Sequence, residues 1–321
     1  MTVIETALTR LLGITHPILL APMGSAAGGK LAAAVTHAGG LGLIGSGYAD
    51  AGAVSRELVA AGNAKVGVGF ITWALDAKPD ALRVALDAKP AAIMLSFGDP
   101  APYAAAIRDA GSKIICQVQT LAEAEQAARL GVDVIIAQGR DAGGHSGTTR
   151  GTMGLVPAVV DIAGSIPVVA AGGIADGRGL AAVLNLGASG VSMGTRFTAT
   201  RESLWDDAMR SQVIEAGGDQ TAQTRVFDIV RGAPWPEHYP GRALKNDFFQ
   251  RWHGDEEQLQ AARPDEEKTY LGTRLDDFST RVVWAGEGVD LVKDVPSAAE
   301  VIERIVTDAA AVLARGAALV R

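Results

Sequence analysis

A glycine-rich loop with a single histidine is the stretch of this sequence best suited to chemistry. Four glycines fall between Gly139 and Gly147, and His145 lies among them, a few residues after the apolar run Val132–Ala137. Such a run predicts a buried strand, and the glycines end it in a loop whose backbone can approach a ligand closely. An imidazole at the end of a strand can take or give a proton near neutral pH. The alternative is an ordinary turn with a solvent-exposed histidine.

Three other strand ends carry residues that favour ligand binding. The first apolar run ends in Ala21-Pro22-Met23-Gly24, the seventh in Gly172-Gly173 and the eighth in Gly194-Thr195. Paired glycines and a Gly-Thr pair expose backbone N–H groups, and in an eight-fold barrel the loops after strands seven and eight form the phosphate pocket. The sequence therefore predicts a phosphorylated substrate or cofactor, with two ordinary glycine turns as the alternative.

Glutamines on two neighbouring runs add uncharged amides to the same site. Gln117 and Gln119 share one face of the fifth run and can point into the mouth of a barrel, and Gln138 follows the sixth run. Amides suit the polar edge of a heterocycle such as flavin. We find no metal-ligand spacing. Hydrolysis by a Ser–His–Asp triad is a weaker alternative, because the sequence lacks a GxSxG elbow and Ser146 is adjacent to His145.

A repeating α/β architecture must position these residues. Eight apolar runs recur along the first 193 residues, and stretches rich in Ala, Leu, Glu and Arg separate most of them. Because the runs are apolar throughout instead of alternating, both faces of the sheet should be covered. We predict a (β/α)8 TIM barrel, and the missing GxGxxG weakens the alternative of a doubly wound open sheet. The predicted strands are Pro17–Met23, Leu41–Gly45, Lys65–Ile71, Ala91–Phe97, Lys113–Val118, Val132–Ala137, Ile166–Ala171 and Gly190–Met193, and the predicted helices include Gly29–His37, Ala51–Ala61, Pro79–Ala88, Pro102–Ala110, Leu121–Leu130 and Arg178–Leu186.

The strand–helix rhythm breaks after the eighth run, and a more charged, aromatic segment follows. We predict three parts: residues 1–203 as the barrel, residues 204–282 as a cap or insert, and residues 283–321 as a return to the barrel. Within the cap, we predict a helix over Leu204–Gly217. The prolines of the stretch 234–241 predict an irregular segment. At the C-terminal end, Ser297 and Glu300 have the spacing of a capping box for a helix over Pro296–Ala317.

Composition and charge exclude several classes of protein. A net charge of -7 over 321 residues provides no basic field for nucleic acid. The single cysteine, Cys116, excludes an internal disulfide framework, and its apolar strand predicts a buried thiol. No run of 18 apolar residues suggests a membrane span, and the N-terminus lacks the pattern of a signal peptide. We therefore expect a cytoplasmic enzyme without nucleic-acid or membrane partners.

Four ordered motifs resemble the nitronate monooxygenase family, formerly called 2-nitropropane dioxygenase. The resemblance runs from Pro17 to Thr200 and continues more weakly through the stretches 225–228, 235–236 and 284–288. Where the family often has Gly-Val-Asn after the third strand, this chain reads Gly67-Val68-Gly69, so it departs from the family at one flavin contact. The four motifs are Ala21-Pro22-Met23, Gln138-Gly139 followed by Ala142-Gly143-Gly144-His145, Ala171-Gly172-Gly173-Ile174 and Met193-Gly194-Thr195-Arg196-Phe197.

The resemblance implies an FMN-binding TIM barrel that oxidises alkyl nitronates with dioxygen to a carbonyl compound and nitrite. It implies that His145 is the catalytic residue, acting as the base for a neutral nitroalkane. The cofactor-binding residues that it implies are Ala21, Pro22 and Met23 along the isoalloxazine, Gln117 and Gln138 at the flavin and its ribityl chain, Gly172, Gly173, Gly194 and Thr195 at the phosphate, and Gly143 in the histidine loop.

Two other functions stay open at this point. The FMN-dependent enoyl-acyl carrier protein reductases share the Ala-Gly-Gly-His loop, so the enzymatic alternative is an NAD(P)H-dependent FMN reductase acting on a quinone or an enoyl thioester. The non-enzymatic alternative is a flavin-binding or ligand-sensing barrel. The sequence names neither the physiological substrate nor the oligomeric state, for which a homodimer is one option.

Overall fold

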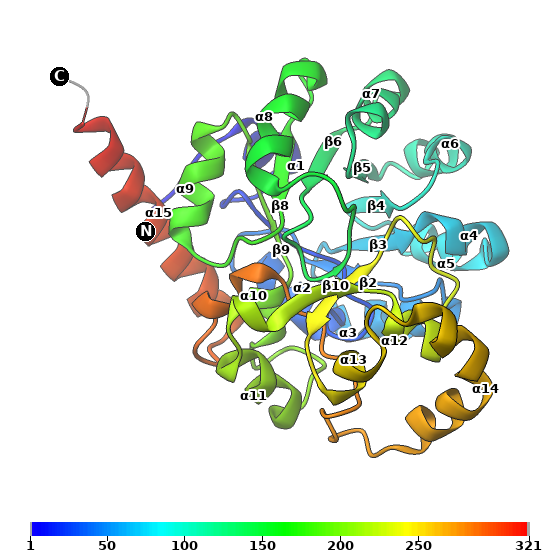
Figure 1. Cartoon of the computed structure of the whole chain (residues 1–321). Coiled ribbons are helices and arrows are strands. Elements are labelled where there is room, and N and C mark those ends of the chain that lie inside the picture. Colours follow the sequence, from blue (N-terminus) through cyan, green and yellow to red (C-terminus); the bar gives the residue numbers. More distant parts are fainter. Residues whose placement is uncertain (1, 320–321) are drawn as a thin grey trace.

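Eight parallel strands form a barrel that helices surround (Figure 1), as the computed structural model shows for residues 2–319. The strand order is β1-β9-β8-β6-β5-β4-β3-β2, and a bridge between Leu19 and Leu41 connects β1 to the residues before β2. The TIM-barrel prediction is confirmed. The strands are β1 (Ile18–Leu20), β2 (Leu43–Gly45), β3 (Gly67–Ile71), β4 (Ala92–Ser96), β5 (Lys113–Val118), β6 (Val134–Gln138), β8 (Val168–Ala171) and β9 (Gly190–Met193).

The strand sequences are apolar at successive positions because both faces of each strand are buried, one inside the barrel and one against the helices. One face of each strand packs inside the barrel, where Leu19, Met94 and Ile136 belong to one buried cluster. The other face packs against the helices. Leu8 of α1 (Ala7–Leu12) joins the inner cluster, and the Thr6 hydroxyl donates to the carbonyl oxygen of Ser189, so α1 covers the amino end of the barrel.

The surrounding helices follow the strands, but the last one comes from the end of the chain. α15 (Ala298–Ala317) packs between α9 and α2 and so takes the place of the helix after β9. The predicted capping box is present, since the Ser297 hydroxyl accepts from Glu300 N and the Glu300 carboxylate accepts from Ser297 N. The other helices of the ring are α2 (Gly29–His37), α3 (Ala51–Ala61), α4 (Thr72–Ala77), α5 (Asp80–Asp87), α6 (Ala101–Asp109), α7 (Leu121–Leu130), α8 (Thr152–Ala163) and α9 (Gly177–Asn185).

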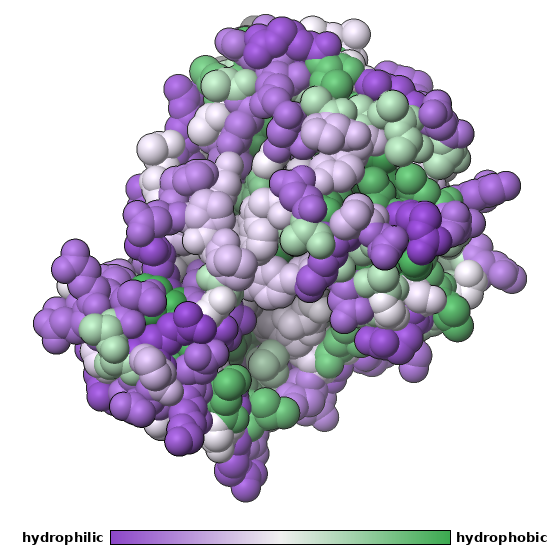
Figure 2. Space-filling model, turned by 90° about the vertical axis from the view of Figure 1, so that its right-hand side faces the viewer, coloured by the Kyte–Doolittle hydropathy of each residue, from purple (hydrophilic) through white to green (hydrophobic). Residues whose placement is uncertain are grey.

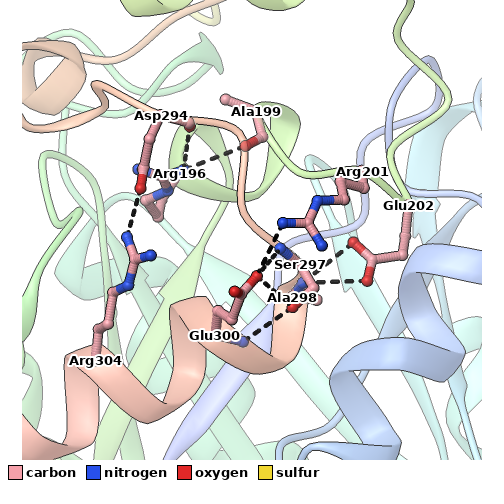
Figure 3. Close-up of polar contacts among 9 residues, drawn as sticks. All are labelled: Arg196, Ala199, Arg201, Glu202, Asp294, Ser297, Ala298, Glu300 and Arg304. Carbon is pink, nitrogen blue, oxygen red and sulfur yellow. Dashed lines mark hydrogen bonds and ion pairs between the residues drawn. The ribbon is translucent and has the colours of Figure 1, made fainter.

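A polar cluster fastens the start of α15 to the loop after β9 (Figure 3). The buried Arg196 guanidinium donates to Asp294 Oδ1 at 3.1 Å, to the Asp294 carbonyl oxygen at 2.8 Å and to the Ala199 carbonyl oxygen at 3.2 Å. Arg304 of α15 binds the same Asp294 carboxylate from the other side. The cluster therefore holds α10 (Thr195–Thr198), which begins at the predicted Gly194-Thr195 motif, against the returning chain.

The cap, which we define as residues 204–282, has its own small core in its later part, whereas Trp205 and Val213 pack in one cluster with Ala26 and Ala199 of the barrel. The antiparallel strands β10 (Thr221–Thr224) and β11 (Gly241–Leu244) are surrounded by helices, and a buried aromatic cluster that includes Phe227, Phe248 and Tyr270 packs among them. The stretch 234–240 is irregular, as its prolines predicted, but Gly241, the last residue of the predicted stretch 234–241, begins β11. The helices of the cap are α11 (Asp207–Glu215), η1 (Gly218–Gln220), α12 (Val226–Val230), α13 (Asp247–Trp252) and α14 (Glu256–Gly272), and η2 (Glu287–Leu291) lies between the cap and α15.

Two details differ from or complete the sequence predictions. The helix predicted over Leu204–Gly217 begins only at Asp207, because the Asp206 carboxylate caps it by accepting from Met209 N at 2.8 Å. Cys116 is buried, at 3% exposure, as predicted.

No helix within residues 2–319 has the length and apolar character needed to cross a membrane. Figure 2 shows a mainly hydrophilic face on which apolar residues gather in separate small patches.

Candidate functional site

One cavity of about 440 Å³ opens at the carboxyl ends of the barrel strands, where barrel enzymes carry their sites. Loops after β1, β6, β8 and β9 line it, together with side chains from β3, β4 and β5 and from the cap. Every catalytic and cofactor-binding residue that the family resemblance implied lines this cavity, although the ligand that each contacts stays a prediction. These residues are Ala21, Pro22, Met23, Gln117, Gln138, Gly143, His145, Gly172, Gly173, Gly194 and Thr195.

Glycines form a cradle on one part of the cavity wall. Gly172 and Gly173 have φ angles of +109° and +69°, a region that L side chains rarely adopt. A Cβ atom on Gly172 would lie 2.7 Å from the Thr152 hydroxyl oxygen. Within residues 2–319, neither the N–H of Gly173 nor that of Thr195 finds a hydrogen-bond acceptor. Two free backbone donors beside side-chain-free backbone fit a phosphate group.

Gly69, where the chain departs from the family pattern, packs closely against the first strand end. A Cβ atom on Gly69 would overlap the ring of Pro22, because the first strand end packs directly against β3. A similar fit occurs at Gly194, where a Cβ atom would lie 3.3 Å from Met23 Sδ. The Ala21-Pro22-Met23 turn therefore fills space that larger residues at positions 69 and 194 would need, and it forms an apolar wall of the cavity.

Three glutamine amides form a connected network beneath the histidine loop. Gln138 Oε1 accepts from Gln117 Nε2 at 3.0 Å and from Gln119 Nε2 at 2.8 Å, while Gln138 Nε2 donates to the His145 carbonyl oxygen at 3.1 Å. Gln117 and Gln138 line the cavity, but Gln119 does not and is only 3% exposed. The prediction that Gln119 points into the mouth is therefore wrong, because its amide is used to hold Gln138.

The loop that carries His145 is tied to the cap. β7 (Gly144–His145) pairs antiparallel with β11, with His145 opposite Gly241 and Gly144 opposite Arg242. The imidazole lies flat on the indole of Trp235, with ring centroids 3.5 Å apart. Only 10% of the side chain is exposed, so the alternative of a solvent-exposed turn histidine is wrong.

The electrostatic surroundings of His145 keep its ring neutral near neutral pH. Burial lowers the pKa of His145 and is the largest influence on it. The Asp228 carboxylate, whose Oδ2 lies 2.8 Å from Nε2, acts to raise this pKa, while the positive charge of Arg231 acts to lower it. Because the pKa of His145 is below its ordinary value, the ring can accept a proton from a bound molecule.

The structure adds functional-site residues that the sequence analysis did not single out. Asp228 and Arg231 come from α12 and the residue after it, and Arg231 Nη2 donates to Asp228 Oδ1 at 3.0 Å. Trp235 Nε1 donates to the Tyr48 hydroxyl at 3.0 Å. The resemblance did extend through the stretches 225–228 and 235–236, which was the one available signal, but it gave them no role. The aromatic wall around Trp235 comprises Tyr48, Trp73, Phe97 and Tyr239.

No metal site accompanies this cavity in the described chain. Within residues 2–319, no group of three or more His, Cys, Asp or Glu side chains is arranged to hold a metal ion. Besides the Arg231 guanidinium, the cavity offers free N–H groups, neutral amides, an apolar turn and one neutral imidazole. This donor set suits a phosphorylated, uncharged ring system.

Comparisons with known sequences place the chain among the nitronate monooxygenases and their relatives. The model of the family described as nitronate monooxygenase matches residues 5–64 and 63–308. Nitronate monooxygenase npaC of Metarhizium robertsii is 35% identical, over 92% of this chain and 91% of its own length. A Mycobacterium tuberculosis protein, (3aS,4S,5R,7aS)-5-hydroxy-7a-methyl-1-oxo-octahydro-1H-indene-4-carboxyl-CoA dehydrogenase, is 33% identical over 99% of both chains.

Solved structures share the whole fold. FabK from Thermotoga maritima superposes with a TM-score of 0.85 at 30% identity, over 99% of this chain and 100% of that one. Nitroalkane oxidase from Streptomyces ansochromogenes superposes with a TM-score of 0.80 at 29% identity, over 97% and 99% of the two chains. The family match spans nearly the whole sequence, and the chain therefore belongs to the nitronate monooxygenase family of oxidoreductases.

Proposed function

We propose that this protein binds FMN in the 440 Å³ cavity and oxidises alkyl nitronates with dioxygen to a carbonyl compound and nitrite. The observation that carries the proposal is the joint presence, in one cavity, of a glycine cradle with free N–H groups and a buried, neutral imidazole. Membership of the nitronate monooxygenase family supports the same reaction. The family resemblance and the phosphate cradle favour FMN as the flavin.

The residues present can accommodate each part of FMN. The N–H groups of Gly173 and Thr195 are free to donate to the phosphate. The Ala21-Pro22-Met23 turn offers an apolar surface for the ring, and the amides of Gln117 and Gln138 offer polar partners for its edge and for the ribityl chain. Bound FMN would supply the redox chemistry, taking electrons from the nitronate and passing them to dioxygen.

The protein's own residues would bind the substrate and handle its proton. For a neutral nitroalkane, His145 removes the proton on the carbon next to the nitro group, which leaves a nitronate anion and a protonated imidazole. The protonated ring and the nearby Arg231 guanidinium, which also lines the cavity, then stabilise the anion. Burial under Trp235 and Trp284 keeps water from the ring.

The proposal is tested by mixing the purified protein, loaded with FMN, with ethyl nitronate under anaerobic conditions and following flavin absorption. We expect the absorption to change with the nitronate, and nitrite to appear after air is admitted. NADH and NADPH are tested in parallel, and each should reduce the flavin only slowly. A flavoprotein that releases no nitrite would contradict the proposed reaction. A protein that retains no FMN would contradict the assignment of FMN as the cofactor.

Two findings favour a second candidate, an NAD(P)H-dependent FMN reductase acting on an enoyl thioester. The M. tuberculosis relative matched over 99% of both chains is named a carboxyl-CoA dehydrogenase, and FabK shares the fold with a TM-score of 0.85. The same anaerobic experiment separates the two functions. Rapid loss of flavin absorption with NADH or NADPH, without a response to nitronate, would establish the reductase instead.

A further inference from the structure

The cap contributes a carboxylate to the histidine that the barrel presents. Asp228 lies in α12, and its side chain is 6% exposed. Oδ2 of this carboxylate lies 2.8 Å from His145 Nε2, and Oδ1 accepts from Arg231 Nη2 at 3.0 Å. We infer that Asp228, held by Arg231, fixes the Nε2–H form of His145 and so leaves Nδ1 as the atom that takes the substrate proton. The inference rests on the proposed function and makes Asp228 a positioning residue.

The assignment of the proton follows from the chemistry of the pair. An ionised carboxylate only accepts hydrogen bonds, so the hydrogen between Asp228 and His145 must belong to the imidazole. The Arg231 guanidinium, which donates from Nη2 to Asp228 Oδ1 at 3.0 Å and from Nε to the Phe227 carbonyl oxygen at 2.8 Å, places a fixed positive charge beside that carboxylate. A neutral imidazole carries one hydrogen, and with that hydrogen at Nε2 the lone pair lies on Nδ1.

The ring cannot readily exchange its two nitrogens. Its backbone is fixed by pairing with β11 and by the Gln138 amide, and one ring face lies on Trp235 with planes 5° apart. Within residues 2–319, Nδ1 has no hydrogen-bond partner and is not among the fully buried unpartnered atoms. Since His145 lines the cavity, Nδ1 is its free nitrogen there.

Other charged groups near the loop are already engaged. Arg242 of β11 pairs with Glu287 at 2.8 Å, and its Nε donates to the Arg140 carbonyl oxygen at 3.2 Å. Asp141, in the same loop as His145, accepts from Thr152 N at 2.6 Å. Asp228 is therefore the carboxylate that acts on the ring, and Arg231 is the cation next to it.

The inference predicts that Asp228 matters for one substrate, a neutral nitroalkane, and not for the other, a nitronate anion. With a neutral nitroalkane, the substrate C–H proton moves to Nδ1, the C–H electron pair stays on the nitronate, and Nε2 keeps its hydrogen and its hydrogen bond to Asp228. A nitronate added as the anion needs no such transfer. Asp228→Asn puts an amide beside Nε2 that can donate to it, which favours the Nδ1–H form and blocks the base.

We would compare Asp228→Asn with the wild-type protein on both substrates. We expect kcat/KM for nitroethane to fall by about 10²-fold or more, the scale of a lost general base, while kcat/KM for ethyl nitronate stays within a few-fold. Asp228→Glu, which keeps a carboxylate, should recover part of the nitroethane activity. The exposed Asp247→Asn in the same cap is the matched control and should behave as wild type.

Nitrogen-15 NMR of the wild-type protein and of Asp228→Asn reads the protonation directly, with His145→Asn to assign the signal. We expect a protonated Nε2 and a bare Nδ1 in the wild type, and a shift toward Nδ1–H in Asp228→Asn. Equal losses on both substrates with an unchanged Nε2–H signal would show a merely structural role and overturn the inference. A wild type that turns over neither substrate would contradict the proposed function, while the NMR result would still decide the hydrogen-bond assignment.

Discussion

Trp235 of the cap covers one face of the imidazole of His145, with planes 5° apart and centroids 3.5 Å apart. The indole is itself fixed, because it lies between Pro234 and Pro236 and donates from Nε1 to the Tyr48 hydroxyl at 3.0 Å. One barrel loop and one cap segment therefore set the exposure of the histidine together. Its protonation should respond to changes in the cap as well as to changes in the barrel.

Removal of the stacked indole should change the titration of His145. In Trp235→Ala, water reaches the ring, so the burial that lowers the pKa of His145 is relieved and this pKa should rise toward 6.5. The measurement is the pH profile of kcat/KM for nitroethane, whose midpoint should move to higher pH. Trp235→Phe keeps an aromatic ring on the imidazole and serves as the control, with a midpoint close to wild type. The same shift in both variants would show that stacking does not set the pKa.

The unmodified protein should show a distinct pH dependence on its two substrates. The neutral form of His145 is the base, and burial lowers its pKa below the ordinary value, so the active fraction rises as pH increases and already exceeds half at pH 6.5. Therefore kcat/KM for nitroethane should rise through a midpoint below pH 6.5 and then level off. For ethyl nitronate this rise should be absent. Stopped assays of nitrite release between pH 5 and 8 test both statements, and a midpoint above 6.5 would contradict them.

Loss of the imidazole should separate cofactor binding from catalysis. His145→Asn removes the base but leaves the glycine cradle and the amides of Gln117 and Gln138 in place. We expect FMN to stay bound, while turnover of nitroethane falls by about 10²–10⁴-fold. His238→Asn changes an exposed cap histidine and is the control, which should keep full activity. Unchanged turnover in His145→Asn would remove His145 from the mechanism.

The barrel was predictable from the sequence because each strand is a local apolar run followed by a helix with its own stop signal. The error at one strand end comes from contacts with a neighbouring strand. β6 begins at Val134 instead of Val132, since the Asp133 carboxylate binds Lys113 Nζ at 2.8 Å and Ile114 N at 2.9 Å. Such side-chain contacts to a neighbouring strand leave no mark in the periodicity of the run itself.

The partners of His145 were not predictable in the same way. Asp228 follows His145 by 83 residues, and no periodicity connects the two segments. Their meeting depends on a two-residue strand, β7, that pairs with β11. A strand that short has no hydrophobic pattern of its own, and its glycines predicted a loop. The barrel part of the site was therefore visible in the sequence, whereas the cap part required the structure.

The glycine cradle makes a prediction about FMN affinity alone. In Gly172→Ala, the new Cβ would lie 2.7 Å from the Thr152 hydroxyl oxygen, and alanine would have to adopt a φ near +109°. The chain should relieve this strain by moving the loop, which displaces the free N–H of Gly173. Strain of about 1–3 kcal/mol corresponds to FMN binding that is weaker by about 5- to 150-fold. The change is measured by titrating the apoprotein with FMN and recording the quenching of flavin fluorescence.

Gly154→Ala in α8 is the matched control, because no atom lies within 4 Å of the added Cβ, and its affinity for FMN should be that of wild type. Equal affinities in Gly172→Ala and Gly154→Ala would place the phosphate elsewhere in the cavity.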